Sequence, residues 1–319
     1  MRRIDTSATM LARGAILLTA LAFSGCSILA PPAVDLEPEI VSKPKVSIKV
    51  IVPEPPRLPP VAIVLTSNQP AYADVARELT HLFDDYLVYD LNDDKRPPVT
   101  ILRLINDSDP GAVVAIGLRA AQSSVAMSTK PVVFSQVFNY QDYDLLTENS
   151  RGVAAIAPLA AQIAAWKKVD PTISRIGAII GEGHEDLITE AKLAAQQHGL
   201  ELRLHVTRSD QETLYVFKRM IRDIDGFWLF PDNRILSRRA LQQILGEAKR
   251  RHVPVLVPNE SMLPMGASIS VSSVASDIAE TIAKVIRQIQ AGNLAQVPPI
   301  SPLSEILVQT SESVQVVNQ

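Results

Sequence analysis

Histidines and acidic pairs are the side chains of this sequence that could do acid–base or metal chemistry. The five histidines, which have no metal-ligand spacing, are His81, His184, His198, His205 and His252. The carboxylate pairs Asp84-Asp85 and Asp93-Asp94 have polar neighbours, which is typical of solvated loops. The chain contains no GxxxxGK[ST] phosphate loop and no GxSxG nucleophile elbow. We therefore predict that the protein is not an enzyme and uses no cofactor or metal.

The single cysteine, Cys26, offers a different chemistry, which is acylation. It follows an apolar run at residues 15–23, with arginines before the run and small residues directly before the cysteine. This layout predicts a bacterial lipoprotein signal peptide, removed as residues 1–25, and a palmitate-bearing Cys26 at the new N-terminus. An ordinary secretory signal with an incidental cysteine is the alternative. The apolar run is too short for a permanent transmembrane helix, so the membrane would be reached through the lipid alone.

Charge and sorting signals indicate where such a protein would work. Removing residues 1–25 takes away three arginines and one aspartate, which changes the formal charge from −3 to −5. An acidic body gives no electrostatic reason to expect a nucleic-acid partner. Ser27 follows the anchor, and serine at this position permits transfer to the outer membrane, whereas aspartate there tends to retain a lipoprotein in the inner one. We expect a periplasm-facing protein of the cell envelope, with the outer membrane favoured.

Residues 26–60 form the predicted tether between the anchor and the folded body. This segment has no glycine, and its nine prolines are Pro31, Pro32, Pro38, Pro44, Pro53, Pro55, Pro56, Pro59 and Pro60. Such a composition favours polyproline-like extension over packing. The apolar stretch 46–52 could instead pair as a strand; disorder throughout is the alternative that we favour.

From residue 61 onward, short apolar runs alternate with amphipathic stretches. In the first half we expect strands at 61–65, 99–104, 113–116 and 132–134, and helices at 71–83, 119–127 and 159–168. In the second half we expect strands at 176–180, 200–206, 226–230, 253–257, 267–271 and 305–309, and helices at 186–197, 211–223, 237–251 and 275–291. This alternation predicts an α/β fold of two doubly wound, Rossmann-like lobes with an interlobe cleft.

Several segments carry a family resemblance when they are taken in order. They are Val113 to Gly117 followed by Ala120-Ala121-Gln122, Lys130 to Phe134, Arg151-Gly152-Val153, Arg175 to Ile180, His198 to Leu202, Asp225 to Asn233 and Val253 to Val257. Together they resemble the ABC-transporter substrate-binding proteins that have a type I periplasmic-binding-protein fold. The resemblance covers about residues 61–310. It implies a first lobe of residues 61–155 plus about 265–310, and a second lobe of residues 156–264.

The resemblance also implies where a ligand would be bound, namely in the loops that follow the strands of both lobes. The expected ligand-binding residues are Ser67, Asn68, Gly117, Gln136, Phe138, Asn139, His184, Asp232, Asn233 and Asn259. Phe138 would stack on an apolar part of the ligand, and Asp232 would pair with an ammonium group. The tyrosine-containing stretch that is usual before the last long helix is absent, and Leu118 stands where a small hydroxyl residue is common. The first departure argues against an aromatic amino acid as the ligand, and the second argues that the pocket is less suited to a carboxylate.

Two function classes follow from this reading. The first is a monomeric solute-binding protein that closes on a small molecule and presents it to an ABC permease or a periplasmic sensor domain. The second is a lipoprotein that uses the same fold as a protein-binding or regulatory module, for example in cell-envelope assembly, with a cleft that no longer binds a solute.

Overall fold

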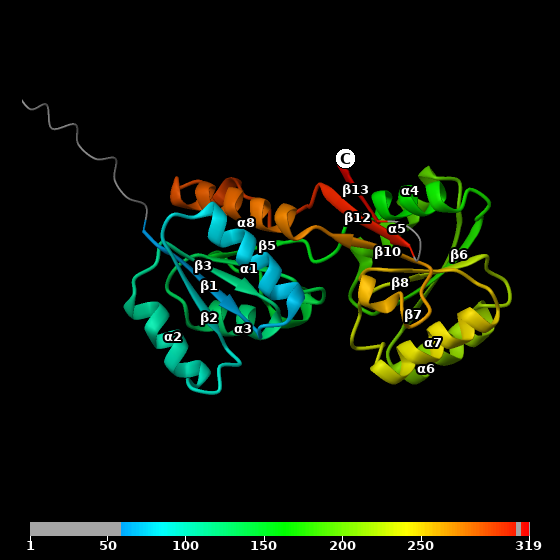
Figure 1. Ribbon diagram of the computed structural model, residues 1–319, viewed down its shortest axis with the longest axis horizontal. Coiled ribbons are helices and arrows are strands. Elements are labelled where there is room, and N and C mark those ends of the chain that lie inside the picture. The colour runs from blue at the N-terminus through cyan, green and yellow to red at the C-terminus, as the bar shows by residue number, and fades with distance from the viewer. Residues whose placement is uncertain (1–58, 311–313, 319) are drawn as a thin grey trace, which may run out of the picture. The chain divides into compact units, whose positions relative to one another are not determined.

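The computed structural model describes residues 59–310 and 314–318 (Figure 1). Cys26, the signal segment and all but the end of the tether lie outside these residues. The described chain contains a six-stranded sheet and a seven-stranded sheet. No helix in this part of the chain is long and apolar enough to cross a membrane.

The first sheet is parallel throughout, with the strand order β11-β5-β4-β3-β1-β2. Its strands are β1 (Val61–Leu65), β2 (Tyr86–Asp90), β3 (Ala112–Ile116), β4 (Val132–Ser135), β5 (Ser150–Val153) and β11 (Ile300–Ser301). Three of them, β1, β3 and β4, are buried along their whole length. This burial on both faces explains why their sequences are continuous apolar runs.

Helices cover both faces of the first sheet. Helices α1 (Pro70–Leu82) and α8 (Ala275–Gln290) pack on one face, and α2 (Pro98–Asp107) and α3 (Leu118–Met127) pack on the other (Figure 1). Alternate residues of β1 therefore enter different cores: Ile63 contacts the α1 and α8 side, and Val64 contacts the α2 and α3 side.

The second sheet has the strand order β13-β12-β10-β9-β8-β6-β7. Its strands are β6 (Arg175–Gly181), β7 (Glu201–Thr207), β8 (Gly226–Leu229), β9 (Val255–Val257), β10 (Ile269–Ser273), β12 (Glu305–Thr310) and β13 (Val314–Asn318). Strands β6 to β10 pair in parallel, whereas β12 and β13 join as antiparallel strands at one edge.

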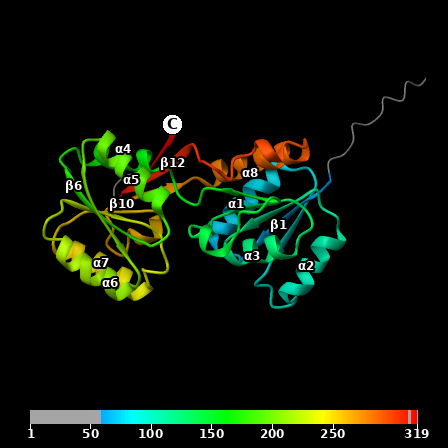
Figure 2. The same cartoon turned by 180° about the vertical axis from the view of Figure 1, so that it is seen from behind.

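Two helix pairs cover this second sheet (Figure 2). Helices α4 (Leu159–Val169) and α5 (Glu185–Gln197) pack on one face, and α6 (Asp210–Met220) and α7 (Arg238–Arg250) pack on the other. Trp166 and Trp228 are fully buried on the α4 side, where the Trp228 indole N–H donates to Gln162 Oε1 at 2.8 Å. Both tryptophans are thus core residues. The 3-10 helices are η1 (Tyr140–Tyr143), η2 (Glu260–Met262) and η3 (Leu294–Gln296).

One predicted strand is wrong. The run 99–104 belongs to helix α2, and the strand at that edge of the sheet is β2, which the sequence reading missed. Pro98 occupies the first turn of α2, where its missing N–H has no cost. Ile101 and Ile105 are buried one turn apart, while Val99 and Leu104 are exposed, which is the pattern of a helix and not of a buried strand.

The expected lobe boundaries also need correction for the stretch of about 265–310. Helix α8 and strand β11 join the first sheet as expected, but β10 and β12 pair within the second sheet. The physical reason is backbone hydrogen bonding. Strand β10 pairs in parallel with β9 on one side, and β12 pairs antiparallel with β10 on the other.

The chain therefore passes between the sheets at residues 154–158, at Val274 and at residues 302–304. The second and third of these crossovers are joined by the buried carboxylate of Asp277. It accepts hydrogen bonds from the Ser304 N–H at 2.8 Å, the Ser304 hydroxyl at 2.7 Å and the Glu305 N–H at 2.9 Å. This arrangement fixes the crossovers relative to each other.

Candidate functional site

The candidate site is built from loops that follow the carboxyl ends of strands in both sheets. Strand β4 of the first sheet leads into Gln136, Phe138 and Asn139, whereas β6 and β8 of the second sheet lead into His184 and Asp232. In parallel sheets these ends are where ligands are bound, because loops from neighbouring strands converge there.

A buried carboxylate, that of Asp232, is the centre of the polar part of the site. Asp232 is fully buried, and its Oδ1 accepts from Asn139 Nδ2 at 3.2 Å. Arg234 donates to both carboxylate oxygens, through Nε at 3.0 Å and Nη2 at 2.8 Å, and the Gly181 N–H donates to Oδ2 at 3.0 Å. Such a two-point guanidinium contact is among the stronger charge-assisted arrangements. The expected pairing of Asp232 with a ligand ammonium group is therefore not available in this conformation, because the protein itself uses the carboxylate.

The same contacts decide the ionisation of Asp232. Burial would raise the pKa of the carboxyl, but the neighbouring His184 and Arg234 outweigh burial and hold the pKa well below its usual range. His184 Nε2 lies 3.6 Å from Asp232 Oδ2, which is too long for a direct hydrogen bond. Asp232 is thus a structural anion at neutral pH.

Hydrogen bonds link the loops of the two sheets at this point. Asn139 of the first sheet donates to Asp232 and to Asn233 Oδ1 at 3.2 Å, and its own Oδ1 lies 2.9 Å from His184 Nε2. A second link joins Asp142 of η1 to Arg234 Nη1 at 2.8 Å. We call Asn139, Asp142, His184, Asp232 and Arg234 the polar latch, because its contacts connect loops of one lobe to loops of the other.

Gly181 makes room for the latch. A Cβ on this residue would lie 2.3 Å from Asp232 Oδ2 and 2.7 Å from Arg234 Nη2. Neither atom can move without giving up a hydrogen bond to the other. The glycine at the end of β6 is therefore required by close approach and not by backbone conformation.

A pocket of about 260 Å³ lies on one side of the latch, and we call it the polar pocket. Side chains from both lobes line it: Tyr72, Leu118, Gln136, Val137, Phe138, Asn139, Tyr143, Ala155, Pro231 and Asn233. Its hydrogen-bonding groups are amides and phenols, and none of these ten residues carries a charge. Gln136 has a φ of 60°, which is uncommon for a residue with a side chain and typical of functional loops.

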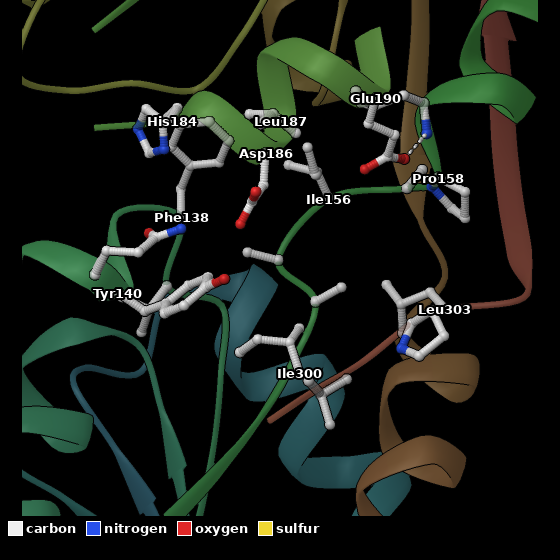
Figure 3. Close-up of a pocket in the computed structure, with 18 residues that line it drawn as sticks. Phe138, Tyr140, Ile156, Pro158, His184, Asp186, Leu187, Glu190, Ile300 and Leu303 are labelled. Carbon is white, nitrogen blue, oxygen red and sulfur yellow. Dashed lines mark hydrogen bonds between the residues drawn. The ribbon is translucent and has the colours of Figure 1, made fainter. Parts of the chain in front are cut away.

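A second pocket of about 260 Å³ borders the crossover segments, and we call it the crossover pocket (Figure 3). Its walls are mainly apolar and come from residues 137–141, from residues 153–159 and 300–303 at two of the crossovers, and from the first turns of α5. Five side chains with polar ends also line it: Tyr140, Gln141, His184, Asp186 and Glu190.

Phe138 lines both pockets, as do Val137 and Ala155, and it is the aromatic residue that they share. Its ring lies 4.9 Å from the His184 ring, centroid to centroid and tilted by 50°. An aromatic side chain of one lobe thus packs on a ring of the other at the centre of the site.

The structure brings together six of the residues that the sequence predicts for the site. They are Gln136, Phe138, Asn139, His184, Asp232 and Asn233. Gly117 borders the polar pocket indirectly: its φ is 86°, and a Cβ there would lie 2.7 Å from Thr66 Oγ1 and 2.9 Å from the Tyr72 ring.

Five of the expected residues, Ser67, Asn68, Gly117, Asp232 and Asn259, line neither pocket, although Asp232 belongs to the latch beside them. Asn68 is exposed, and the Ser67 hydroxyl oxygen is buried without a partner among the described residues. Asn259 caps η2, where its Oδ1 accepts from the Ser261 N–H at 2.9 Å. A family position that is read as a ligand contact can thus serve a local turn instead.

Residues that the sequence reading missed include both partners of the second latch contact, Asp142 and Arg234. Arg234 stands two positions after Asp232, and this short spacing is the one sequence signal that could have found the pair. Tyr72, Tyr140 and Tyr143 also line the pockets, but nothing in the sequence marks them, because they come from a helix and a 3-10 turn and not from a strand end.

A metal site and a carboxylate pair were the other chemistries to examine in the described residues. No group of three or more His, Cys, Asp or Glu in this part of the chain could hold a metal ion. The Asp84-Asp85 pair is exposed, and Asp93 accepts from the Lys95 N–H and from Arg96 in a surface turn. The site offers surfaces and hydrogen bonds for binding.

A model of the ABC transporter substrate-binding protein family matches residues 85–314, which is more than half of the chain. The chain belongs to this family. Comparison with curated protein sequences gives no match. As an ABC substrate-binding protein it is a member of a class that binds substrates and does not transform them, and that acts outside the cytoplasm.

Solved structures show the same fold. A ligand-free, open substrate-binding protein with adhesive properties from Clostridium difficile has a TM-score of 0.57 at 14% identity, over 82% of this chain and 92% of that one. An ABC domain in complex with L-Trp from Streptococcus pneumonia has a TM-score of 0.53 at 17% identity, over 79% and 92%. A periplasmic ribose ABC transporter protein from Conexibacter woesei has a TM-score of 0.51 at 12% identity, over 80% and 92%. The substrate-binding protein therefore has the expected type I periplasmic-binding-protein fold, with two α/β lobes.

Proposed function

We propose that this substrate-binding protein binds a small organic solute in the crossover pocket, against Phe138, and presents it in a closed form to an ABC permease. The observation that carries the proposal is the place of Phe138. It is a first-lobe aromatic side chain that contacts a second-lobe ring and forms a wall of two pockets. A solute that packs against Phe138 would touch both lobes at once.

Closure follows from such a contact. A ligand can favour the closed state only if it binds that state more tightly than the open one. A solute in the crossover pocket would contact residues 137–141 of the first lobe and residues 184–190 of the second. The contacts of the solute would then favour the closed state together with the hydrogen bonds of the polar latch, which link loops of the same two lobes.

A thermal-shift screen tests this function directly. A ligand present at about 100 times its dissociation constant stabilises the folded protein by about 2.7 kcal/mol. We expect at least one compound from a library of amino acids, amines, nucleosides and small acids to raise the melting temperature of the wild-type protein. The shift should be lost in Phe138→Ala and retained in Tyr215→Ala, a matched control whose aromatic side chain is 62% exposed on α6. Absence of any shift across the library would favour the protein-binding alternative.

We also propose that Cys26 carries the lipid anchor and that the body faces the periplasm from the outer membrane. The support is the sequence layout around Cys26 and the serine at position 27. The wild-type protein should incorporate radioactive palmitate and sediment with the outer-membrane fraction, and Cys26→Ala should do neither. Palmitate incorporation by Cys26→Ala would overturn the anchor assignment.

A further inference from the structure

The crossover pocket has a one-sided charge. Of the eighteen residues that line it, Asp186 and Glu190 are acidic and none is lysine or arginine. His184 is the remaining lining residue that could carry a positive charge, and its Nε2 is engaged by Asn139 Oδ1 at 2.9 Å. The pocket therefore presents negative charge to whatever enters it.

The two carboxylates lie on one face of α5, one helical turn apart, and both stand at the pocket (Figure 3). Like charges at this spacing repel each other, so the arrangement costs stability to the free protein. Within the described part of the chain, no lysine, arginine or histidine forms an ion pair with either. Among the described residues, the one hydrogen bond to these carboxylates is a long one, from the Leu159 N–H to Glu190 Oε1 at 3.4 Å.

A purely structural role explains one of the carboxylates but not both. Asp186 is in the first turn of α5, where a negative charge stabilises the helix dipole. Glu185 already supplies a charge in the same turn, outside the pocket. Glu190 is beyond the first turn, where the helix dipole gives it no such benefit.

Aromatic rings complete the surroundings. Phe138 and Tyr140 line the same pocket, and Figure 3 shows the Asp186 carboxylate on the side of the Tyr140 hydroxyl. Burial, and to a smaller extent the charge of Asp186, raise the pKa of Tyr140, so the phenol stays neutral. Ring faces beside carboxylates attract organic cations, because the negative face of each ring adds to the charge of the acids.

We propose that the crossover pocket selects an organic cation, namely an amine joined to an apolar, ring-bearing body. The proposal deepens the function proposed above and rests on it. The ammonium group would bind between Asp186, Glu190 and the Tyr140 hydroxyl, and the body would pack against Phe138, Ile156 and Leu303. A free carboxylate on the ligand is disfavoured, because the pocket offers it no cation and two anions.

Three indole compounds that share one ring system and differ in the charge of a short side chain test this inference. They are tryptamine, which is a cation, tryptophol, which is neutral, and indole-3-propionate, which is an anion. Isothermal titration with the purified full chain should show that tryptamine binds about tenfold more tightly than tryptophol, because charge-assisted contacts are about twice as strong as neutral ones. Indole-3-propionate should bind most weakly. The preference for tryptamine should shrink as salt is raised, because the carboxylates are partly open to solvent.

Matched variants locate the effect. Asp186→Asn and Glu190→Gln should each weaken tryptamine binding several-fold. This fold-change corresponds to a loss of about 1 kcal/mol or less in binding free energy. Both should leave tryptophol binding unchanged. Glu185→Gln removes a charge from the same helix turn but does not line the pocket, and it should leave all three affinities unchanged.

Equal or tighter binding of tryptophol or indole-3-propionate overturns the inference, and so does a tryptamine affinity that responds equally to Glu185→Gln and Asp186→Asn. Failure of tryptamine to bind at millimolar concentration also overturns it. Should a variant fail to fold, the three-compound comparison on the wild-type protein still decides. The solute-binding function fails separately, when no compound of any charge in the library shifts the melting temperature.

Discussion

The polar latch and the crossover pocket share Phe138 and His184 as neighbours, yet they treat their carboxylates in opposite ways. Asp232 in the latch is fully buried and accepts hydrogen bonds from three residues, Asn139, Gly181 and Arg234. Asp186 and Glu190 in the pocket are exposed, and neither forms an ion pair within the described residues. A carboxylate such as Asp232, whose oxygens already accept hydrogen bonds from the protein, stabilises the fold. A carboxylate without a cationic partner in the protein is available to bind a ligand. The difference separates structural from binding chemistry within one site.

The largest effect on stability is expected when Arg234, the cation of the latch, is removed. Arg234→Met leaves Asp232 buried without its guanidinium, and we expect a loss of about 3 kcal/mol in the free energy of unfolding. The matched control is Arg175→Met, which disrupts a pair with Asp225 whose side chains are 45% and 33% exposed. That change should cost less than about 1 kcal/mol. Urea denaturation measures both values, and similar losses in the two variants would contradict a special role for the latch.

A smaller effect is expected when the space for the latch is filled. Gly181→Ala places a Cβ against Asp232 Oδ2 and Arg234 Nη2, and we expect a loss of about 2 kcal/mol from this overpacking. Gly246→Ala is the control, because its nearest neighbour is a flexible arginine atom at 3.7 Å and alanine is favoured within a helix. If both variants unfold at the same urea concentration as the wild type, the close approach at Gly181 is not tight in solution.

The pocket side of the comparison should respond in binding and much less in stability. Phe138→Ala removes the aromatic wall that the two pockets share. We expect the affinity for any solute found in the screen to fall about tenfold or more, because an aromatic side chain contributes roughly 0.5–1.5 kcal/mol beyond its buried area. Isothermal titration gives the affinity, and unchanged binding by Phe138→Ala would place the solute elsewhere.

The smallest predicted effect is the pH dependence of the stability that Asp225 contributes. The hydrogen bond from the Ser174 hydroxyl, and further contacts with Arg175, lower the pKa of Asp225 to about 2. Because the folded pKa is below the unfolded one, the contribution of Asp225 is present above about pH 4 and is lost as the pH falls toward 2. The stability difference between wild type and Asp225→Asn should therefore shrink over this interval. A difference that is constant from pH 5 to pH 2.5 would contradict the assigned pKa.

Much of the fold is predictable from the sequence because burial imposes composition. Strands β1, β3 and β6 are continuous apolar runs, and Gly199, with a φ of 67°, ends α5 as its type predicts. The error at residues 99–104 has a physical cause: a short apolar run does not distinguish a buried strand from one face of a helix. The prolines directly before it were the better signal.

The site was predictable in its loops but not in its contacts. Strand ends correctly placed Gln136, Phe138, Asn139 and Asp232 near one another. The spacing of Asp232 and Arg234 was a signal for a contact between them, but spacing alone does not decide it, because the contact depends on the directions of the two side chains. Asp186 and Glu190 lie on the helix expected at 186–197, but no sequence signal places the crossovers beside them.

Hydrogen exchange in the presence and absence of a solute that stabilises the protein tests the central claim most directly. If the solute is held against Phe138 in the crossover pocket, backbone amides should gain protection in residues 137–141, 153–159, 184–190 and 300–303, which come from both lobes and the crossovers. Protection confined to one lobe, or found around β2 and α2 instead of these segments, would contradict the claim that the solute joins the two lobes at this site.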